Sequence, residues 1–348
     1  MKQHSQSNKV YPVLKFENKD NIFFNVGRHL SYNAFVNFFV GGRGVGKTTS
    51  GFIYTFNRYN NYDEQFVYLK RYKTEIVEFI NTNTIGQMFD NVFTKGIGEK
   101  NGWEICCEDS VCGYVLPLSA MSTFKSTMFS KVTTIIFDEV FMEKGKTYYL
   151  PNEVFTFLQF ISTVQRLRTN LRVLLFSNNN SLYNPYFDYW KIPDYEWRYF
   201  NKERGIYCEN IPVNPKLLEL EKVTPLYKLT AGTAYGDYHY SNTILRQTRV
   251  EVSPKPANAS YMCSILLNND SLVIYNTNQG LWIVAVTDRK IDDYTYRLYK
   301  DGKLMKFYAM RYKQRLQGTL EYLFGTDGIK YGNAKAYDML QFIFGMIP

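Results

Sequence analysis

Residues 41–49, GGRGVGKTT, constrain the fold of this chain more than any other segment. Gly41, four further residues, and then Gly46, Lys47 and Thr48 have the spacing of a phosphate-binding loop. In such a loop the glycines let backbone N–H groups turn toward a phosphate, the lysine contacts the β- and γ-phosphates, and the threonine hydroxyl reaches Mg²⁺. We therefore expect a nucleotide site made of these residues: Gly41, Gly42, Arg43, Gly44, Val45, Gly46, Lys47, Thr48 and Thr49.

A second acidic motif indicates what happens to the nucleotide. The apolar run VTTIIFDEV (132–140) ends in Asp138 and Glu139. Asp138 is expected to hold Mg²⁺ together with Thr48, and Glu139, one residue on, can polarise an attacking water. A kinase has no need of that second carboxylate, since its nucleophile is a substrate hydroxyl. Glu139 therefore favours hydrolysis.

Strand-like segments alternate with helix-like ones over the first half of the chain. The expected strands are 35–40, 64–71, 132–140 and 171–178, with a hairpin at 103–118 and helices at 47–60 and 151–168. Nearly continuous apolar strands alternating with helices predict an α/β domain whose mostly parallel sheet is covered on both faces. Because strand 64–71 comes between the phosphate loop and the Asp138 strand, the pattern is that of RecA-like ATPases with an additional strand and a catalytic glutamate.

The residues after 208 have a different sequence pattern. Prolines recur at 212, 215, 225, 254 and 256, which is typical of a linker region. Three short strands, YMCSILL, SLVIYN and LWIVAVT, then follow with turn residues between them, YTYRLYK is a candidate fourth, and helices are expected near 303–317 and 333–345. We expect a phosphate-loop ATPase domain at 1–208, a linker at 209–250 and a small α+β domain at 251–348.

Composition excludes several classes of protein. No apolar run approaches the roughly 18 residues of a membrane span, and the first residues lack the apolar centre of a signal peptide, so we expect a cytosolic protein without membrane contact. Five cysteines and three histidines offer neither a disulfide framework nor a zinc-ligand spacing. The net charge of +9 is compatible with a polyanionic partner, and residues 289–315 carry nine Lys or Arg against three Asp. A solvated helix face explains that basic run equally well.

Three polar positions extend the expected site. Asn178, after Ser177 at the end of strand 171–178, is placed to contact the γ-phosphate. Arg166 and Arg168 close the helix 151–168, where a cation is favourable beside the helix C-terminus. Either one could instead enter a neighbouring subunit's site as an arginine finger.

The order of several segments resembles the DNA-packaging ATPases of phi29-type phages. These segments are GGRGVGKTT, EQFVYLKRYK, VLPLSAMSTFKS, TIIFDEV, YLPNEV, RLR, FSNNNSLYNPYF and YNTNQGLWI. The resemblance implies a RecA-like ATPase domain, a linker and a degenerate nuclease domain of ribonuclease H type. It also implies a terminase-like motor that uses ATP and Mg²⁺: a homo-oligomeric ring, expected to be a pentamer, that drives double-stranded DNA into a procapsid.

The same resemblance assigns further residues and partners. Arg166 matches the finger that acts on the neighbouring subunit, Lys125 a basic residue that also approaches the neighbour's nucleotide, and Lys73 a position near the nucleotide. Arg43 is a competing candidate within the loop itself. The motor is expected in the host cytoplasm, transiently on the portal vertex of the procapsid, with a structural RNA as an additional partner in some relatives.

Nuclease activity is not expected. The strands of the C-terminal domain carry no carboxylates, and Asp270 and Asp288 lie only at their ends, whereas a two-metal nuclease needs clustered carboxylates.

Two other functions remain open at this point. The first is another additional-strand DNA-pumping ATPase, such as a plasmid or conjugation motor. The second is a non-hydrolytic assembly protein that binds DNA or RNA under nucleotide control.

Overall fold

The fold was analysed in a computed structural model. It describes residues 11–15, 22–97, 102–124, 127–142, 149–150, 152–178, 184–193, 195, 197–233, 236, 240, 252–267, 270–287, 294–300, 305–307, 328–333, 335–337, 339–340 and 343. Two compact units are present. The first comprises 1–140, 155–179 and 195–242, and the second comprises 141–154, 180–194 and 243–348.

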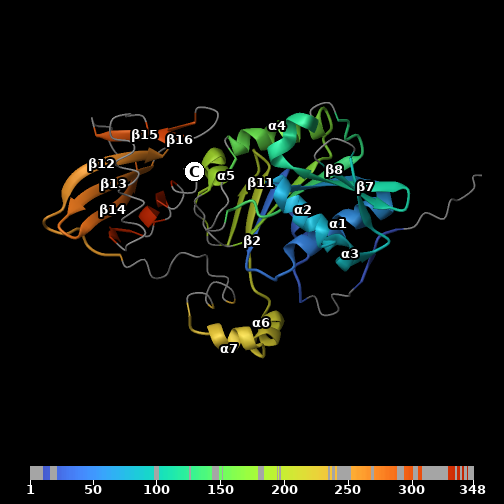
Figure 1. The fold of residues 1–348 in the computed structure, drawn as a ribbon, viewed down its shortest axis with the longest axis horizontal. Coiled ribbons are helices and arrows are strands. Elements are labelled where there is room, and N and C mark those ends of the chain that lie inside the picture. The colour runs from blue at the N-terminus through green and yellow to red at the C-terminus, as the bar shows by residue number, and fades with distance from the viewer. Residues whose placement is uncertain are drawn as a thin grey trace, which may run out of the picture. The chain divides into compact units, whose positions relative to one another are not determined.

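A nine-stranded sheet forms the centre of the first unit (Figure 1). The strand order is β10-β11-β2-β9-β8-β3-β7-β6-β5. The strands span Arg198–Asn201, Ile206–Ile211, Val36–Gly41, Arg172–Asn178, Val132–Phe137, Gln65–Lys70, Ser110–Pro117, Trp103–Cys107 and Phe93–Gly96, in that order. The six from β11 to β7 are parallel, and β10, β6 and β5 add antiparallel edges.

The order of the strands confirms the predicted additional strand. β9 lies between the phosphate-loop strand β2 and the Asp138 strand β8, and β3 lies on the far side of β8. Every residue of β2, β8 and β11 is buried, as expected for parallel strands covered on both faces. Because the strands are parallel, β2, β8 and β9 all end at the same edge of the sheet.

Helices and short segments cover the sheet. Those preceding β8 are η1 (Val26–Tyr32), α1 (Lys47–Tyr62), α2 (Lys73–Asn81), α3 (Thr84–Met88) and η2 (Leu118–Phe124). A two-stranded ribbon joins β1 (Val13–Leu14) to β4 (Phe89–Asp90). α4 (Glu153–Gln165) leads from β8 into β9, and α5 (Pro185–Trp190) belongs to the second unit.

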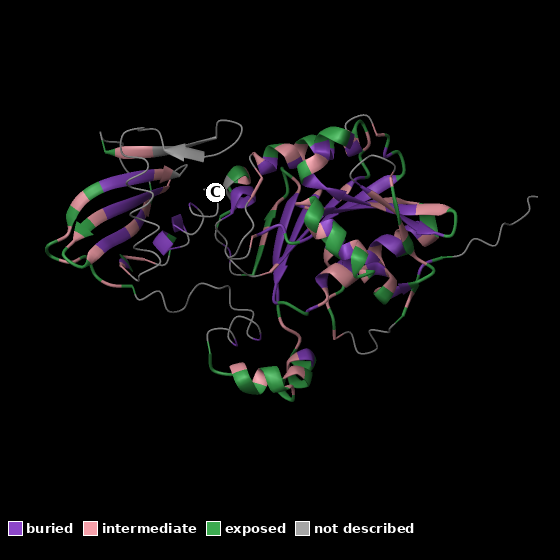
Figure 2. Ribbon diagram, viewed as in Figure 1, coloured by how far each residue is buried: buried purple, intermediate pink, exposed green. Residues whose placement is uncertain are grey.

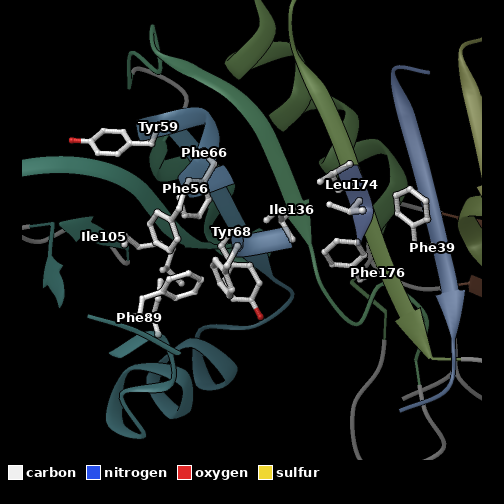
Figure 3. Close-up of a cluster of buried hydrophobic side chains, with 14 of the residues drawn as sticks. Phe39, Phe56, Tyr59, Phe66, Tyr68, Phe89, Ile105, Ile136, Leu174 and Phe176 are labelled. Carbon is white, nitrogen blue, oxygen red and sulfur yellow. The ribbon is translucent and has the colours of Figure 1, made fainter. Parts of the chain in front are cut away.

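Aromatic side chains dominate the core beneath α1. Phe56, Phe66 and Tyr68 gather there with Phe176 of β9 (Figure 3). Gly51 allows α1 to approach β9 closely, because a Cβ at this position would lie 2.6 Å from Phe176 Cε2. This packing fixes the start of α1 above the edge where the strands end.

Two helices, α6 (Pro215–Lys222) and α7 (Pro225–Thr230), extend from the first unit after β11 (Figure 1). Each begins with a proline preceded by a capping side chain: Asn214 accepts from the Lys216 N–H, and Thr224 accepts from the Tyr227 N–H. Most of their surface is exposed (Figure 2). They fall within the predicted linker, whose boundaries at 208 and 250 remain predictions.

The second unit contains a six-stranded sheet of order β16-β15-β12-β13-β14-β17. Its strands span Met305–Phe307, Thr295–Lys300, Ser260–Leu267, Asp270–Thr277, Gly280–Thr287 and Ile329–Tyr331, in that order. The predicted antiparallel meander β12-β13-β14 and the fourth strand β15 are confirmed. Residues 335–337, 339–340 and 343 are helical, in agreement with the helix expected at 333–345.

One expectation for this unit was wrong. A helix was predicted at 303–317, but residues 305–307 are a strand that pairs with β15, because the alternating YTYRLYK segment offers them an antiparallel partner. Residues 308–317 and most of the basic run 289–315 lie outside the described residues. Within the described part of the chain, no helix is long and apolar enough to cross a membrane.

Candidate nucleotide site at the edge of the parallel sheet

The phosphate loop joins β2 to α1. Gly44 and Gly46 have φ angles of 75° and 88°, which side-chain-bearing residues rarely adopt, and α1 begins at Lys47. The Lys47 ammonium is buried inside the loop, where it donates to the Gly41 and Gly42 carbonyl oxygens at 2.9 and 2.7 Å. It also donates to Asn178 Oδ1 at 3.2 Å, so the amide predicted to contact the γ-phosphate does lie beside the loop lysine.

Asp138 joins the loop to the neighbouring strands. Its Oδ2 accepts from the Thr48 hydroxyl at 2.8 Å and from the Tyr68 hydroxyl at 2.9 Å. Burial and the neighbouring Asp138 carboxylate raise the pKa of Tyr68 well above its ordinary value, so Tyr68 is a neutral donor. A hydroxyl and a carboxylate in contact at a helix start are hard oxygen ligands suited to Mg²⁺. Among the described residues there is no group of three or more His, Cys, Asp or Glu arranged for a metal, and a Mg²⁺ ion that also binds phosphates and water does not require one.

Glu139 is held in an unusual backbone conformation, with a φ of 55°. Its carboxylate is 57% exposed and accepts from Lys70 Nζ at 2.6 Å, while Asp138 lies 3.9 Å from the same ammonium. Burial alone would lower the pKa of Lys70, but the two carboxylates outweigh it and raise that pKa, so Lys70 is cationic. Arg71, also buried, donates to the Glu139 and Val140 carbonyls at 3.3 and 2.8 Å and fixes the turn.

A cavity of about 530 Å³ opens over these groups. Its lining includes most of the predicted nucleotide-binding residues: Arg43, Gly44, Gly46, Lys47, Thr48, Thr49, Asp138, Glu139 and Asn178. Gly41 and Gly42 contribute carbonyls to Lys47, while Val45 is buried in the core. The volume is within the range of cavities that hold small-molecule ligands.

Three apolar side chains, Phe23, Phe24 and Ile53, also line the cavity, and we call them the apolar wall. The Phe24 N–H donates to the Val45 carbonyl at 2.9 Å and the Val26 N–H donates to Ser50 Oγ at 2.7 Å, so the segment before η1 is attached to both the loop and α1. The sequence motif did not predict this wall, because Phe23 and Phe24 precede the loop and Ile53 follows it in α1, all outside the motif itself.

The two arginines after α4 have different environments. The Arg168 guanidinium donates to the carbonyls of Phe129, Ser130, Val132 and Val164. Burial, followed by the nearby Arg166, lowers the pKa of Arg168. Because this guanidinium donates to four backbone carbonyls, Arg168 connects the end of α4 to the start of β8.

Arg166, in contrast, is exposed, with a φ of 50° just beyond the last turn of α4. It lies near the start of β8, whereas Asp138 follows the end of that strand. Six residues of strand separate the two ends by about 20 Å, which an arginine side chain cannot span. Arg166 therefore cannot reach the cavity of its own chain.

Two further lysines, Lys73 and Lys125, were expected near the nucleotide. Lys73 is exposed at the first turn of α2 and is not part of the cavity lining, and Lys125 lies outside the described residues. Tyr68, Lys70 and Arg71 were missed as partners of the acidic pair. The segment EQFVYLKR could have identified these three residues, because a strand that pairs in parallel with β8 must end beside Asp138 and Glu139.

Known proteins resemble this chain over most of its length. Residues 18–323 match the family described as Podovirus DNA encapsidation protein (Gp16). The DNA packaging proteins of Bacillus phages phi29 and PZA are each 31% identical over 286 residues, covering 80% of this chain and 83% of theirs. That of Bacillus phage B103 is 33% identical over 261 residues, covering 74% and 79%.

Solved structures agree with this match. The Phi-28 gp11 DNA packaging motor superposes with a TM-score of 0.58 at 18% identity, over 94% of this chain and 98% of that one. The bacteriophage Phi-29 viral genome packaging motor assembly superposes with a TM-score of 0.59 at 24% identity, over 92% and 99%. At these identities the similarity concerns the fold, which confirms the predicted α/β class. Together with the phosphate loop, the acidic pair and the additional strand, the match establishes that this chain belongs to the Podovirus DNA encapsidation protein (Gp16) family.

Proposed function

We propose that the chain is an ATP-driven motor that moves double-stranded DNA into a phage procapsid. The observation that carries this proposal is the convergence of Lys47, Thr48, Asp138, Glu139 and Asn178 on one cavity, in a chain of the DNA encapsidation family. The test is hydrolysis of ATP in the presence of DNA and procapsid. Glu139→Gln should retain ATP binding and lose multiple turnovers, whereas a nucleotide-controlled binding protein would work equally well with either residue.

The contacts of the cavity support a division of roles. Lys47 would leave the Gly41 and Gly42 carbonyls to meet the β- and γ-phosphates, and Asn178 would contact the γ-phosphate. Thr48 and Asp138 would hold Mg²⁺, which neutralises phosphate charge when bound. The base would lie on the apolar wall of Phe23, Phe24 and Ile53, where stacking favours any flat ring and gives little discrimination among bases.

Glu139 would accept a proton from the attacking water. Its Oε2 is paired with Lys70, which holds the side chain at the turn after β8, so the other oxygen, Oε1, would meet a water beside the γ-phosphate. The Glu139 side chain is 57% exposed, which leaves room for that water, and the left-handed backbone fixes the point from which the side chain starts.

Arg166 would act in a neighbouring subunit. Its location at the opposite edge of its own sheet supports a role in trans, and the carbonyl contacts of Arg168 disfavour Arg168 as the finger. Arg43 lines the cavity of its own chain and is the rival within the loop. Lys125 and Lys73 remain candidates on the resemblance alone.

A finger supplied in trans requires a homo-oligomer, and we propose a ring of five subunits on the portal of the procapsid in the host cell. A structural RNA is a further candidate partner. A motor must accept any DNA sequence, so phosphate contacts should dominate and affinity should fall steeply with salt. A flat salt response would count against this.

We further propose that the C-terminal domain does not cut DNA. Asp270, a carboxylate at the end of β13, accepts from Lys335 Nζ at 2.7 Å and from the Thr287 hydroxyl at 2.9 Å, which favours a structural role. Linear DNA incubated with the protein, Mg²⁺ and Mn²⁺ should stay intact. Cleavage that disappears in Asp270→Asn would contradict the proposal.

A further inference from the structure

Exposed apolar side chains follow one another at a constant spacing along α6 and α7. Leu220, Val223, Leu226 and Leu229 are three residues apart and between 46% and 78% exposed, and we call them the hairpin row. Leu217, one step earlier at the same spacing, is buried in the core of the first unit. Four exposed apolar side chains on two short consecutive helices, next to a leucine that is anchored in the core, are typical of a surface that packs on another protein.

The helix that carries the start of the hairpin row lies next to the phosphate loop. Glu221 of α6 approaches the phosphate loop, because a Cβ on Gly44 would lie 3.9 Å from Glu221 Oε1. Burial raises the pKa of this carboxylate, as expected for an acid beside the loop and away from water. A protein that packs along α6 would therefore also lie next to the phosphate loop that lines the cavity.

The opposite edge of the sheet carries a matching surface. Leu167, the residue after Arg166, is 100% exposed. Met128 is 70% exposed and directly precedes Phe129, whose carbonyl accepts from Arg168. We call Met128, Arg166 and Leu167 the finger face: two apolar side chains beside an exposed cation.

We propose that the finger face of one copy packs on the hairpin row of the next copy. This rests on the proposed trans role of Arg166: if Arg166 enters a neighbour's cavity, Leu167 must arrive at what borders that cavity, and α6 borders it. Charge is compatible with this contact, since α6 carries Glu221 beside the loop and the adjacent Lys222 is paired with Glu219. The two surfaces differ, so the contact is head-to-tail and can close into a ring.

Cross-linking tests this contact. The five native cysteines are buried, so Leu167→Cys and Val223→Cys in one chain provide the accessible thiols for a short bis-maleimide. The cross-linker is added to chains bound to procapsids, and the mass of the complex confirms that the chains are assembled. The double variant should give a ladder of covalent oligomers. A mixture of the two single variants should stop at dimers, because each such pair has used its only thiols. Phe93→Cys in place of Val223→Cys is the control, since Phe93 is exposed on the edge strand β5, and it should give no ladder.

The proposed contact and the trans role of Arg166 can fail independently of each other, and the outcomes distinguish the two. Leu167→Ser should weaken association by about tenfold, the effect of losing one buried leucine contact, and Phe93→Ser should not. Assembled chains that fail to cross-link would overturn the contact, even if Arg166 still complements in trans. A full ladder without trans complementation would retain the contact and refute the finger.

Discussion

Lys70 Nζ lies 2.6 Å from Glu139 Oε2, so the expected catalytic base of this ATPase is paired with a cation from the neighbouring strand. The pair joins the end of β3 to the turn after β8, and Arg71 secures the same turn through its backbone. The group proposed to activate water is therefore positioned by a strand that is not part of the phosphate loop.

Lys70→Ala should lower DNA-stimulated turnover at least tenfold with little change in ATP affinity, because Lys70 orients Glu139 but does not line the cavity. Steady-state kinetics would separate the two parameters. The matched control is Lys131→Ala, which removes an ion pair of the same 2.6 Å length, with Asp63, at an exposed site away from the cavity. A change confined to ATP affinity would contradict the positioning role.

Tyr68→Phe should lower the free energy of unfolding by about 1 kcal/mol and raise the Mg²⁺ concentration needed for half-maximal ATPase activity. The buried hydroxyl is one of two donors that orient Asp138 Oδ2, and its loss leaves the carboxylate less well fixed. Mg²⁺ titration of hydrolysis and urea unfolding test the two effects. An unchanged Mg²⁺ requirement would restrict Tyr68 to a structural role.

Gly51→Ala should destabilise the ATPase domain by about 1–3 kcal/mol, even though alanine is the better helix former. The added Cβ would meet the Phe176 ring at 2.6 Å and Ile136 Cδ1 at 3.2 Å. Asn57→Ala, on the exposed side of the same helix, should be neutral or stabilising. Thermal unfolding of both variants measures the difference. Equal effects would show that α1 does not pack this closely on β9.

Glu209, on β11 beside the phosphate-loop strand, should give the fold an acid-sensitive component. Burial alone would raise its pKa, but hydrogen bonds from His29, Tyr207 and Arg198 outweigh burial and lower it. A lowered folded-state pKa contributes stability that is fully present above the unfolded value of about 4.5 and is lost as the pH falls through the folded value. Urea unfolding of Glu209→Gln should show a deficit at pH 7 that shrinks below pH about 4. A deficit independent of pH would assign the effect to packing.

The sequence predicted the parts of the site that depend on local patterns. The glycine spacing located the loop, and apolar strands ending in Asp138 and Asn178 placed their polar residues at one edge, because parallel strands share that edge. The helices α6 and α7 were not predicted, although the capping pairs Asn214-Pro215 and Thr224-Pro225 were a local signal for them.

Long-range pairings were not predictable in the same way. β11 pairs with β2, although Ile206 and Val36 are far apart in the chain, and no local pattern encodes that register. The choice between Arg166 and Arg168 depended on four backbone carbonyls from two segments of the chain, 129–132 and the end of α4. Sequence periodicity does not specify where such carbonyls point.

The central claim, a site completed by Arg166 of a neighbouring subunit, is tested most directly by mixing two inactive variants. Arg166→Ala and Glu139→Gln chains should each be nearly inactive. Rings that contain both should recover DNA-stimulated phosphate release, because some interfaces pair an intact Glu139 with an intact Arg166. A parallel mixture of Arg43→Ala with Glu139→Gln should stay inactive if Arg43 acts within its own chain. No recovery in the first mixture, with subunit mixing confirmed by mass, would contradict the trans finger.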